Sequence, residues 1–155
     1  MNNVTAFDQH LKNIMNFIFA KLYEEYLRQE DSPNRRITMY ISIVYFFLTF
    51  VIALPIKAYI DKQIFKNQIH YEKWTIMVAV FAVLIIITYF VHLIYIKKGF
   101  LERTVIKHKR KKIKKSILYL IVALTPVTLM LFAGTITVYL TGGDIFGHKI
   151  HGLLE

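Results

Sequence analysis

Three long stretches of this sequence carry no charged side chain, and they constrain the fold more than any other feature. They are residues 37–56, 74–96 and 116–143. Each is long enough for a helix to cross the roughly 30 Å hydrocarbon core of a bilayer, which takes about 20 residues. All 20 basic and 10 acidic residues lie outside these stretches, as expected when a charge at the centre of a membrane helix costs about 2.5–3.5 kcal/mol. The sequence therefore predicts an all-α integral membrane protein with three transmembrane helices, at 37–56, 74–96 and 116–141.

The amino-acid composition also indicates that much of the chain lies in a bilayer. Hydrophobic residues make up 55% of the 155-residue chain, whereas soluble proteins contain about 45–50%. A soluble fold would interleave apolar and polar positions at the period of a helix or a strand, and here the apolar residues form uninterrupted runs. Because the chain contains no cysteine, disulfides, thiolate metal sites and cysteine nucleophiles are excluded.

The first 36 residues precede the first span and are expected to stay on the mature protein. The apolar stretch 14–20 is short, follows an aspartate and lacks the small-x-small pattern of a cleavable signal peptide. Between residues 4 and 27, apolar residues recur at helical spacing, which predicts an amphipathic helix lying in the membrane interface. Its apolar face consists of Phe7, Leu11, Ile14, Ile18, Leu22 and Tyr26. The turn-prone residues QEDSPNRR (29–36) predict the end of this helix.

The distribution of basic residues predicts how the chain is oriented. With three spans, segment 1–36 and loop 97–115 lie on one side, and loop 57–73 and tail 142–155 lie on the other. The first side holds 15 Lys and Arg residues and the second holds 5. Because basic residues accumulate in cytoplasmic loops, we expect a cytoplasmic N-terminus and an external, periplasmic C-terminal tail, a pattern that fits a bacterial inner membrane.

Loop 97–115 carries half of all Lys and Arg residues and is the strongest candidate for a binding surface. Each basic residue near an anionic leaflet contributes about 1 kcal/mol, so seven of them set an upper limit of about 7 kcal/mol. Nucleic acid is not an expected partner, because segment 107–116 has no aromatic residue on which bases could stack. We expect anionic lipid to be bound by Lys107, Lys109, Arg110, Lys111, Lys112, Lys114 and Lys115.

Arg103 and His108 in the same loop have the Arg-x4-His spacing of HEPN-type ribonucleases, the one part of that family's pattern that the chain shares. No Ser-His-Asp set, carboxylate pair or phosphate-binding loop accompanies them. The chain is therefore expected not to be an enzyme.

Hydroxyl side chains form one helical stripe on the first span and another on the third. Small and hydroxyl residues let membrane helices pack closely, and an interhelical hydrogen bond contributes about 0.6–2 kcal/mol. A polar conduit is the alternative, but no ionisable residue lines these stripes. The predicted helix-packing residues are Thr38, Ser42, Tyr45, Thr49, Thr125, Thr128 and Thr135.

Histidines supply two further candidate sites. His92 is embedded in the second span, where it suits a haem ligand, a quinone partner or a proton relay, with packing near the interface as the alternative. On the external side, imidazole and carboxylate groups suit zinc or copper. The candidate metal ligands are His70, Glu72, Asp144, His148 and His151, and the last three share one face if the tail is helical. Apart from these sites, no cofactor is expected.

Two known families share parts of this pattern. The segments IKKGFLER (96–103) and SILYLIVAL (116–124), with the basic loop between them, resemble the small immunity proteins that protect bacteria from channel-forming colicins. That resemblance implies a defence protein that acts on a pore-forming toxin or forms a pore. His92 in a three-span chain resembles the cytochrome b anchors of respiratory complexes, which implies a haem- or quinone-associated subunit. From the residues themselves, we expect first a non-catalytic accessory or structural subunit of a larger membrane complex, or a homo-oligomer.

Overall fold

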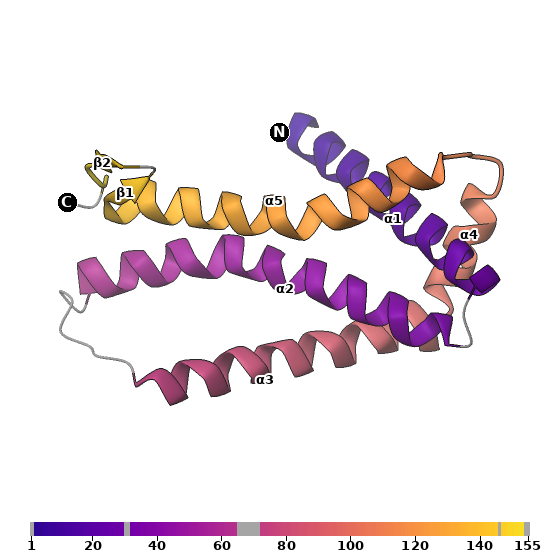
Figure 1. Cartoon of the computed structure of the whole chain (residues 1–155), viewed down its shortest axis with the longest axis horizontal. Helices are drawn as coiled ribbons and strands as arrows, with labels where there is room; N and C mark the ends of the chain where they lie inside the picture. The colour runs from indigo at the N-terminus through magenta and orange to yellow at the C-terminus, as the bar shows by residue number, and fades with distance from the viewer. Residues whose placement is uncertain (1, 30–31, 65–71, 146, 154–155) are drawn as a thin grey trace. The chain divides into compact units, whose positions relative to one another are not determined.

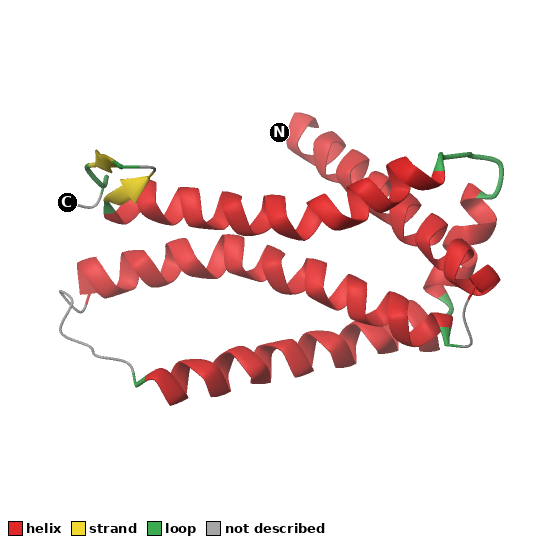
Figure 2. Cartoon of the chain, in the orientation of Figure 1, coloured by secondary structure: helices red, strands yellow, loops and turns green. Residues whose placement is uncertain are grey.

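The computed structural model describes residues 2–29, 32–64, 72–145 and 147–153, and these ranges are mainly helical. The helices are α1 (Asn2–Gln29), α2 (Pro33–Tyr59), α3 (Lys73–Val91), α4 (Phe100–His108) and α5 (Lys115–Thr141) (Figure 1). Two π-helical turns, η1 (Ile60–Ile64) and η2 (His92–Lys97), continue α2 and α3. The short strands β1 (Gly143–Ile145) and β2 (His148–Ile150) follow α5 (Figure 2). The predicted all-α class is confirmed.

Three of the helices are long and apolar enough to cross a membrane. They run over Pro33–Tyr59, Lys73–Lys97 and Lys115–Thr141, and each contains one of the predicted spans. Each extends past its uncharged stretch to lysine or arginine side chains, which can reach the headgroup region while their stems stay in apolar surroundings. The chain is an integral membrane protein, as the sequence predicted.

Proline and glycine mark the ends of these helices. α2 starts at Pro33, whose fixed φ and missing N–H suit the first helical position. Gly99 separates η2 from α4 with a φ of 62°, a left-handed conformation that glycine adopts at low cost. After α5, the N–H of Gly142 donates to the carbonyl of Val138 at 2.8 Å. α5 ends at Thr141, the residue at which the third span was predicted to end.

The chain divides into two compact units, of which unit 1 comprises residues 1–42 and 86–123 and unit 2 comprises residues 43–85 and 124–155. Unit 1 has a hydrophobic core to which all of its helical segments contribute. Its buried apolar side chains include Phe19, Leu22, Tyr23, Ile37, Ile41, Val91, Tyr95, Leu101 and Leu118.

Aromatic rings join the segments of unit 1. The ring of Phe19 on α1 meets Tyr40 edge-on at 5.9 Å and Tyr95 at 6.1 Å between centroids. Tyr95 in turn meets Phe100 of α4 at 5.3 Å. Such edge-to-face pairs contribute about 0.5–1.5 kcal/mol beyond their buried area. α1 is thereby anchored to α2, η2 and α4 within one unit.

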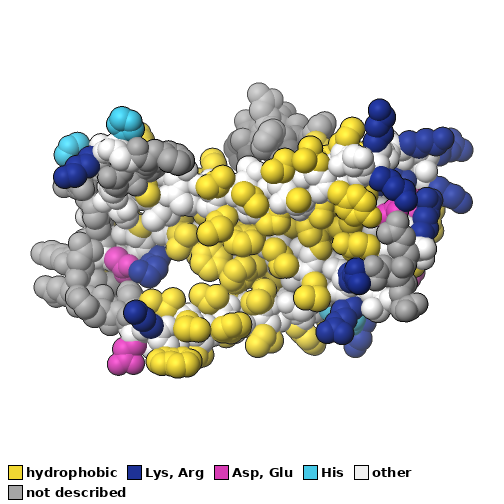
Figure 3. Space-filling model, viewed as in Figure 1, with side chains coloured by type: hydrophobic (Ala, Val, Ile, Leu, Met, Phe, Trp, Pro, Cys, Tyr) yellow, Lys and Arg dark blue, Asp and Glu magenta, His cyan; other side chains and the backbone are white. Residues whose placement is uncertain are grey.

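Unit 2 has almost no core of its own. Among its described side chains, only Val44, Ala58 and Ala133 are buried. Figure 3 shows hydrophobic side chains along the long helices, with Lys and Arg gathered over α4 and the loop after it. Hydrocarbon solvates apolar side chains as well as a protein core does, so this pattern suits helices that face lipid or partner helices. The exposed apolar side chains of unit 2 include Ile52, Trp74, Phe81, Ile85, Met130 and Leu131.

The buried face of α1 differs from the predicted one. α1 is a helix, as expected, and Leu22 of the predicted stripe is buried, but Phe19 and Tyr23 outside that stripe are buried too and Ile14 within it is exposed. The side chains of Phe7 and Leu11 lie outside the described residues. The difference is tertiary in origin, because α1 packs against α4 and that contact decides which positions are covered.

Loop 97–115 and the tail also depart from expectation. The first half of the loop folds as α4, which Gly99 separates from the preceding span. The tail, which the metal-site hypothesis required to be helical, is an antiparallel hairpin in which Gly143 pairs with Ile150 and Ile145 with His148. Gly147 has a φ of 83°, and this conformation allows the tight reversal between the two strands.

Candidate functional site

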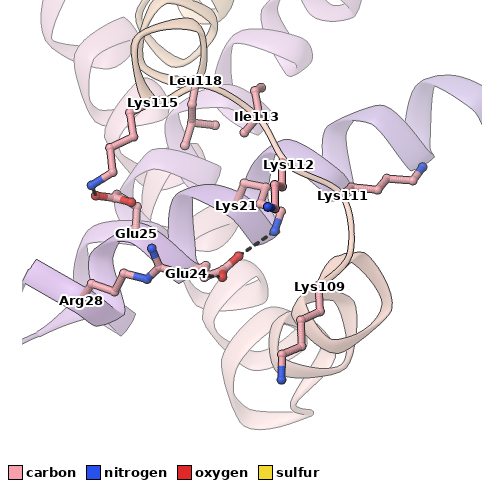
Figure 4. Close-up of a pocket in the computed structure, with 10 residues that line it drawn as sticks. All are labelled: Lys21, Glu24, Glu25, Arg28, Lys109, Lys111, Lys112, Ile113, Lys115 and Leu118. Carbon is pink, nitrogen blue, oxygen red and sulfur yellow. Dashed lines mark hydrogen bonds and ion pairs between the residues drawn. The ribbon is translucent and has the colours of Figure 1, made fainter.

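A groove in unit 1 collects charged side chains from α1, from the loop after α4 and from the start of α5. We call it the basic groove, and it encloses about 340 Å³. Six of its lining residues are basic and two are acidic. The lining consists of Lys21, Glu24, Glu25, Arg28, Lys109, Lys111, Lys112, Ile113, Lys115 and Leu118 (Figure 4).

Both carboxylates of the basic groove already form ion pairs with lysine or arginine side chains of the protein. Glu24 accepts hydrogen bonds from Lys21 at 2.7 Å and from Arg28 at 3.1 Å (Figure 4). The hydrogen bond from Lys21 lowers the pKa of Glu24 most; burial opposes this effect, and the positive charges of Lys21 and Arg28 add to it. Glu24 is therefore ionised at neutral pH, and it fixes two cations along one face of α1 at helical spacing.

The second carboxylate joins α1 to α5. Glu25 is buried, with 7% of its side chain exposed, and it forms an ion pair with Lys115, the first residue of α5. The two residues are 90 positions apart in the sequence. A carboxylate placed in such surroundings is stable only when it is paired, so this ion pair holds one wall of the basic groove in place.

Three lysines of the basic groove are available to a ligand. Lys109, Lys111 and Lys112 are exposed, and no ion pair to them is found among the described residues. The ammonium group of Lys111 lies 5.9 Å from the centroid of the Phe17 ring, a cation–π distance. Lys109 and Lys111 point away from both carboxylates in Figure 4. The arrangement therefore leaves an excess of positive charge that suits an anion.

The structure separates the seven predicted lipid-binding residues into groups. Lys109, Lys111, Lys112 and Lys115 line the basic groove, whereas Arg110 and Lys114 are exposed outside it. Lys107 lies on α4, beside a neighbouring cavity that also touches His108. The sequence analysis missed the contribution of α1, from Lys21, Glu24, Glu25 and Arg28. The helical spacing of Lys21, Glu24 and Arg28 could have indicated from the sequence that they form ion pairs. No local sequence pattern indicated the ion pair of Glu25.

The Arg-x4-His pair has a structural role here. Arg103 donates from Nε to the carbonyl of Gly99 at 3.2 Å and from Nη2 to the carbonyl of Lys98 at 2.6 Å. His108 is buried and meets the Phe17 ring at 5.5 Å between centroids. The guanidinium binds backbone carbonyls and the imidazole packs against Phe17, and both residues border one cavity beside α4.

His108 is also the most unusual titratable group of unit 1. Its Nδ1 is buried and has no hydrogen-bond partner among the described residues. Burial is the main cause that lowers the pKa of His108, and the charges of Lys111, Lys107 and Lys21 lower it further. The imidazole is therefore neutral at pH 7, and its protonation would place a charge inside the contact between α1 and α4.

The predicted hydroxyl stripes are satisfied mainly within their own helices. In unit 1, Thr38 and Ser42 are buried and donate at 2.7 Å to the carbonyls of Asn34 and Thr38. In unit 2, the same type of bond runs at 2.9 Å from Thr49 to Tyr45 and from Thr135 to Leu131. Thr49, Thr128 and Thr135 are exposed, whereas Tyr45 and Thr125 are half-buried. The exposed members lie where another helix could approach.

The histidines that the structure describes are not gathered into one site. His92 is exposed at the start of η2. In the hairpin, Asp144 pairs with Lys149 and His148 pairs with Ile145, so the helical spacing that would have put Asp144, His148 and His151 on one face does not exist. No group of three or more potential metal ligands occurs among the described residues, and His70 lies outside them.

Comparisons with known proteins do not indicate a function for this chain. No protein family, no curated protein and no solved structure matches the chain.

Proposed function

We propose that this chain is a non-catalytic accessory or structural subunit, which acts through helix packing in a larger membrane complex or a homo-oligomer. The observation that carries the proposal is the lack of a core in unit 2. Its part of α3 exposes Trp74, Phe81 and Ile85 by 74%, 58% and 68%. Lipid can cover such side chains, and so can the helices of a partner.

Small and hydroxyl residues on unit 2 favour partner helices. Gly134 of α5 is exposed, and a Cβ added to it would meet no atom within 4 Å. The exposed Thr128 and Thr135 lie about a third of a turn away from it around the helix. In a bilayer the hydrophobic effect does not bring helices together, so close approach at small residues is a main source of their association. We therefore assign the contact to the face of α5 that carries Gly134.

The proposed orientation places the N-terminus and the basic groove in the cytoplasm. It rests on the 15 basic residues predicted on that side against 5 on the other. The proposed location is a bacterial inner membrane, where this charge bias operates. Because the chain has no native cysteine, an impermeant maleimide added to intact cells should miss a cysteine placed at Lys109 and label one placed at Lys149.

The subunit proposal is tested by the state of the protein in native membranes. Gently solubilised protein should elute as an oligomer or co-purify with a defined membrane protein. Gly134→Leu should weaken that association, whereas the control Phe132→Trp, an enlargement on the opposite side of the same helix, should preserve it. A chain that runs as a lone monomer and captures no membrane protein would refute the proposal.

A further inference from the structure

We propose that the basic groove binds the headgroup of an anionic lipid that carries two phosphate groups. This inference concerns unit 1 alone, so its test can fail or succeed independently of whether unit 2 packs against partner helices.

The charge of the lining sets the kind of ligand. Glu24 and Glu25 form ion pairs with Lys21, Arg28 and Lys115. Most of the remaining positive charge comes from Lys109, Lys111 and Lys112, which line the groove and form no ion pair among the described residues. One phosphodiester would offset a single charge of this excess. Two phosphates match the three lysines more closely, through charge-assisted hydrogen bonds.

An apolar part of the lining indicates a lipid rather than a soluble phosphate. Ile113 is half-buried and lines the groove beside the lysines, and the buried Leu118, 3% exposed, forms its apolar floor. Leu118 lies in the first turn of α5, a helix that begins at Lys115 and is long enough to cross the membrane. A lipid presents chemistry in the same order, with phosphate at the headgroup followed by glycerol and acyl carbons. A free phosphate has no apolar group that could contact the apolar end of the groove, and an acidic peptide does not place an acyl chain there.

The fixed wall of the groove favours binding. On the α1 side, Lys21 is held by Glu24, and the ion pair of Glu25 with Lys115 connects that helix to α5. Only the lysines of the loop need to be ordered around a headgroup, which limits the conformational entropy lost on binding. The site therefore depends on the tertiary contact with α1 as well as on the local density of charge.

The direct test is native mass spectrometry of the full-length protein in detergent. The probes are short-chain cardiolipin with two phosphates, short-chain phosphatidylglycerol with one, phosphatidylcholine without net charge, and inorganic pyrophosphate. We expect affinity to fall in the order cardiolipin, phosphatidylglycerol, phosphatidylcholine. Pyrophosphate that binds as tightly as cardiolipin would overturn the assignment to lipid, as would equal affinity for cardiolipin and phosphatidylglycerol.

A matched pair of variants separates the groove from general polybasic attraction. The variants K111Q/K112Q and R110Q/K114Q remove the same number of charges from the same loop, but only the first pair lines the groove. Each basic residue near an anionic headgroup changes affinity about fivefold. K111Q/K112Q should therefore lower the affinity for cardiolipin about 25-fold, and R110Q/K114Q should lower it several times less. All four side chains are exposed, so both variants should fold, and K109Q/K112Q provides a second groove variant. Equal losses in groove and control variants would overturn the proposal.

Discussion

Unit 1 and unit 2 belong to the same continuous helices, yet they are stabilised in different ways. Unit 1 buries side chains from six helical segments around the aromatic contacts of Phe19 and Tyr95. Unit 2 buries only Val44, Ala58 and Ala133 among its described side chains. Where α1 and α4 cover the helices, the chain builds a core like that of a soluble protein. Where the helices lack such a cover, the bilayer or a partner must provide it.

The largest expected effect comes from truncating a core side chain of unit 1. Leu22 and Leu101 are nearly inaccessible, and Leu→Ala at such positions lowers the free energy of unfolding by about 2–5 kcal/mol. Leu131→Ala in unit 2, where the side chain is 66% exposed, serves as the control and should cost less than about 1 kcal/mol. Denaturant unfolding of the purified protein in detergent measures both. Equal costs would break the distinction between the two units.

The ion pair between α1 and α5 should give the next largest effect. Lys115→Met removes from the buried Glu25 carboxylate the lysine that pairs with it. Removing one partner of a fully buried pair costs about 3–5 kcal/mol, and because Lys115 is 60% exposed we expect about 1–3 kcal/mol. The neighbouring Lys114→Met is the control and should be nearly neutral. In a double-mutant cycle, Glu25→Gln should recover part of the loss, and full additivity would argue against the pair.

Two glycines sharpen the comparison through backbone conformation. Gly99 of unit 1 has a φ of +62°, and its added Cβ would come no nearer than 3.8 Å to Glu102. Gly99→Ala should therefore cost about 1–2 kcal/mol from the left-handed conformation alone. Gly134 in the α5 segment of unit 2 is helical and open, so Gly134→Ala should stabilise the isolated chain by up to about 1 kcal/mol. Thermal unfolding of the two variants should shift in opposite directions.

The smallest effect concerns pH and is confined to unit 1. Burial lowers the pKa of His108 below its ordinary value of 6.5, with help from Lys111, Lys107 and Lys21. The unfolded chain then binds more protons than the folded chain, so stability falls as pH drops below about 6.5. His108→Phe should flatten this dependence between pH 7 and pH 5, and the exposed His148→Gln should leave it unchanged. Melting temperatures recorded across that range provide the measurement. A wild-type curve that rises toward acid would contradict the burial of a neutral imidazole.

Local sequence patterns predicted the parts of the fold and of the groove that depend on the solvent or on neighbouring residues. The three spans follow from uncharged stretches of sufficient length, because hydrocarbon excludes charge whatever the tertiary contacts. Four residues of the groove, among them Lys111 and Lys112, were predicted because they lie in one dense basic run. The end of α5 at Thr141 matches the end of the predicted third span, just before two glycines. For each of these features the physical cause lies within a short stretch of chain.

Long-range contacts account for what the sequence analysis did not predict. Glu25 and Lys115 are 90 residues apart, so no periodicity relates them. The metal-site hypothesis required a helical tail, but Gly147 with its φ of 83° allows two strands to pair there. His108 carried a motif-like spacing to Arg103, and only its packing against Phe17 identified it as a core residue.

By itself, the sequence determined that this protein is a three-span, all-α membrane protein with a strongly basic loop. These properties come from the transfer of side chains between water and hydrocarbon, which is set by residue type. Tertiary structure alone decided that α1 packs on α4, that two glutamates of α1 fix one wall of the basic groove, and that unit 2 keeps its apolar surface exposed. The reason is that burial and ion pairing depend on which segments meet in space, and here the segments that meet are far apart in the chain.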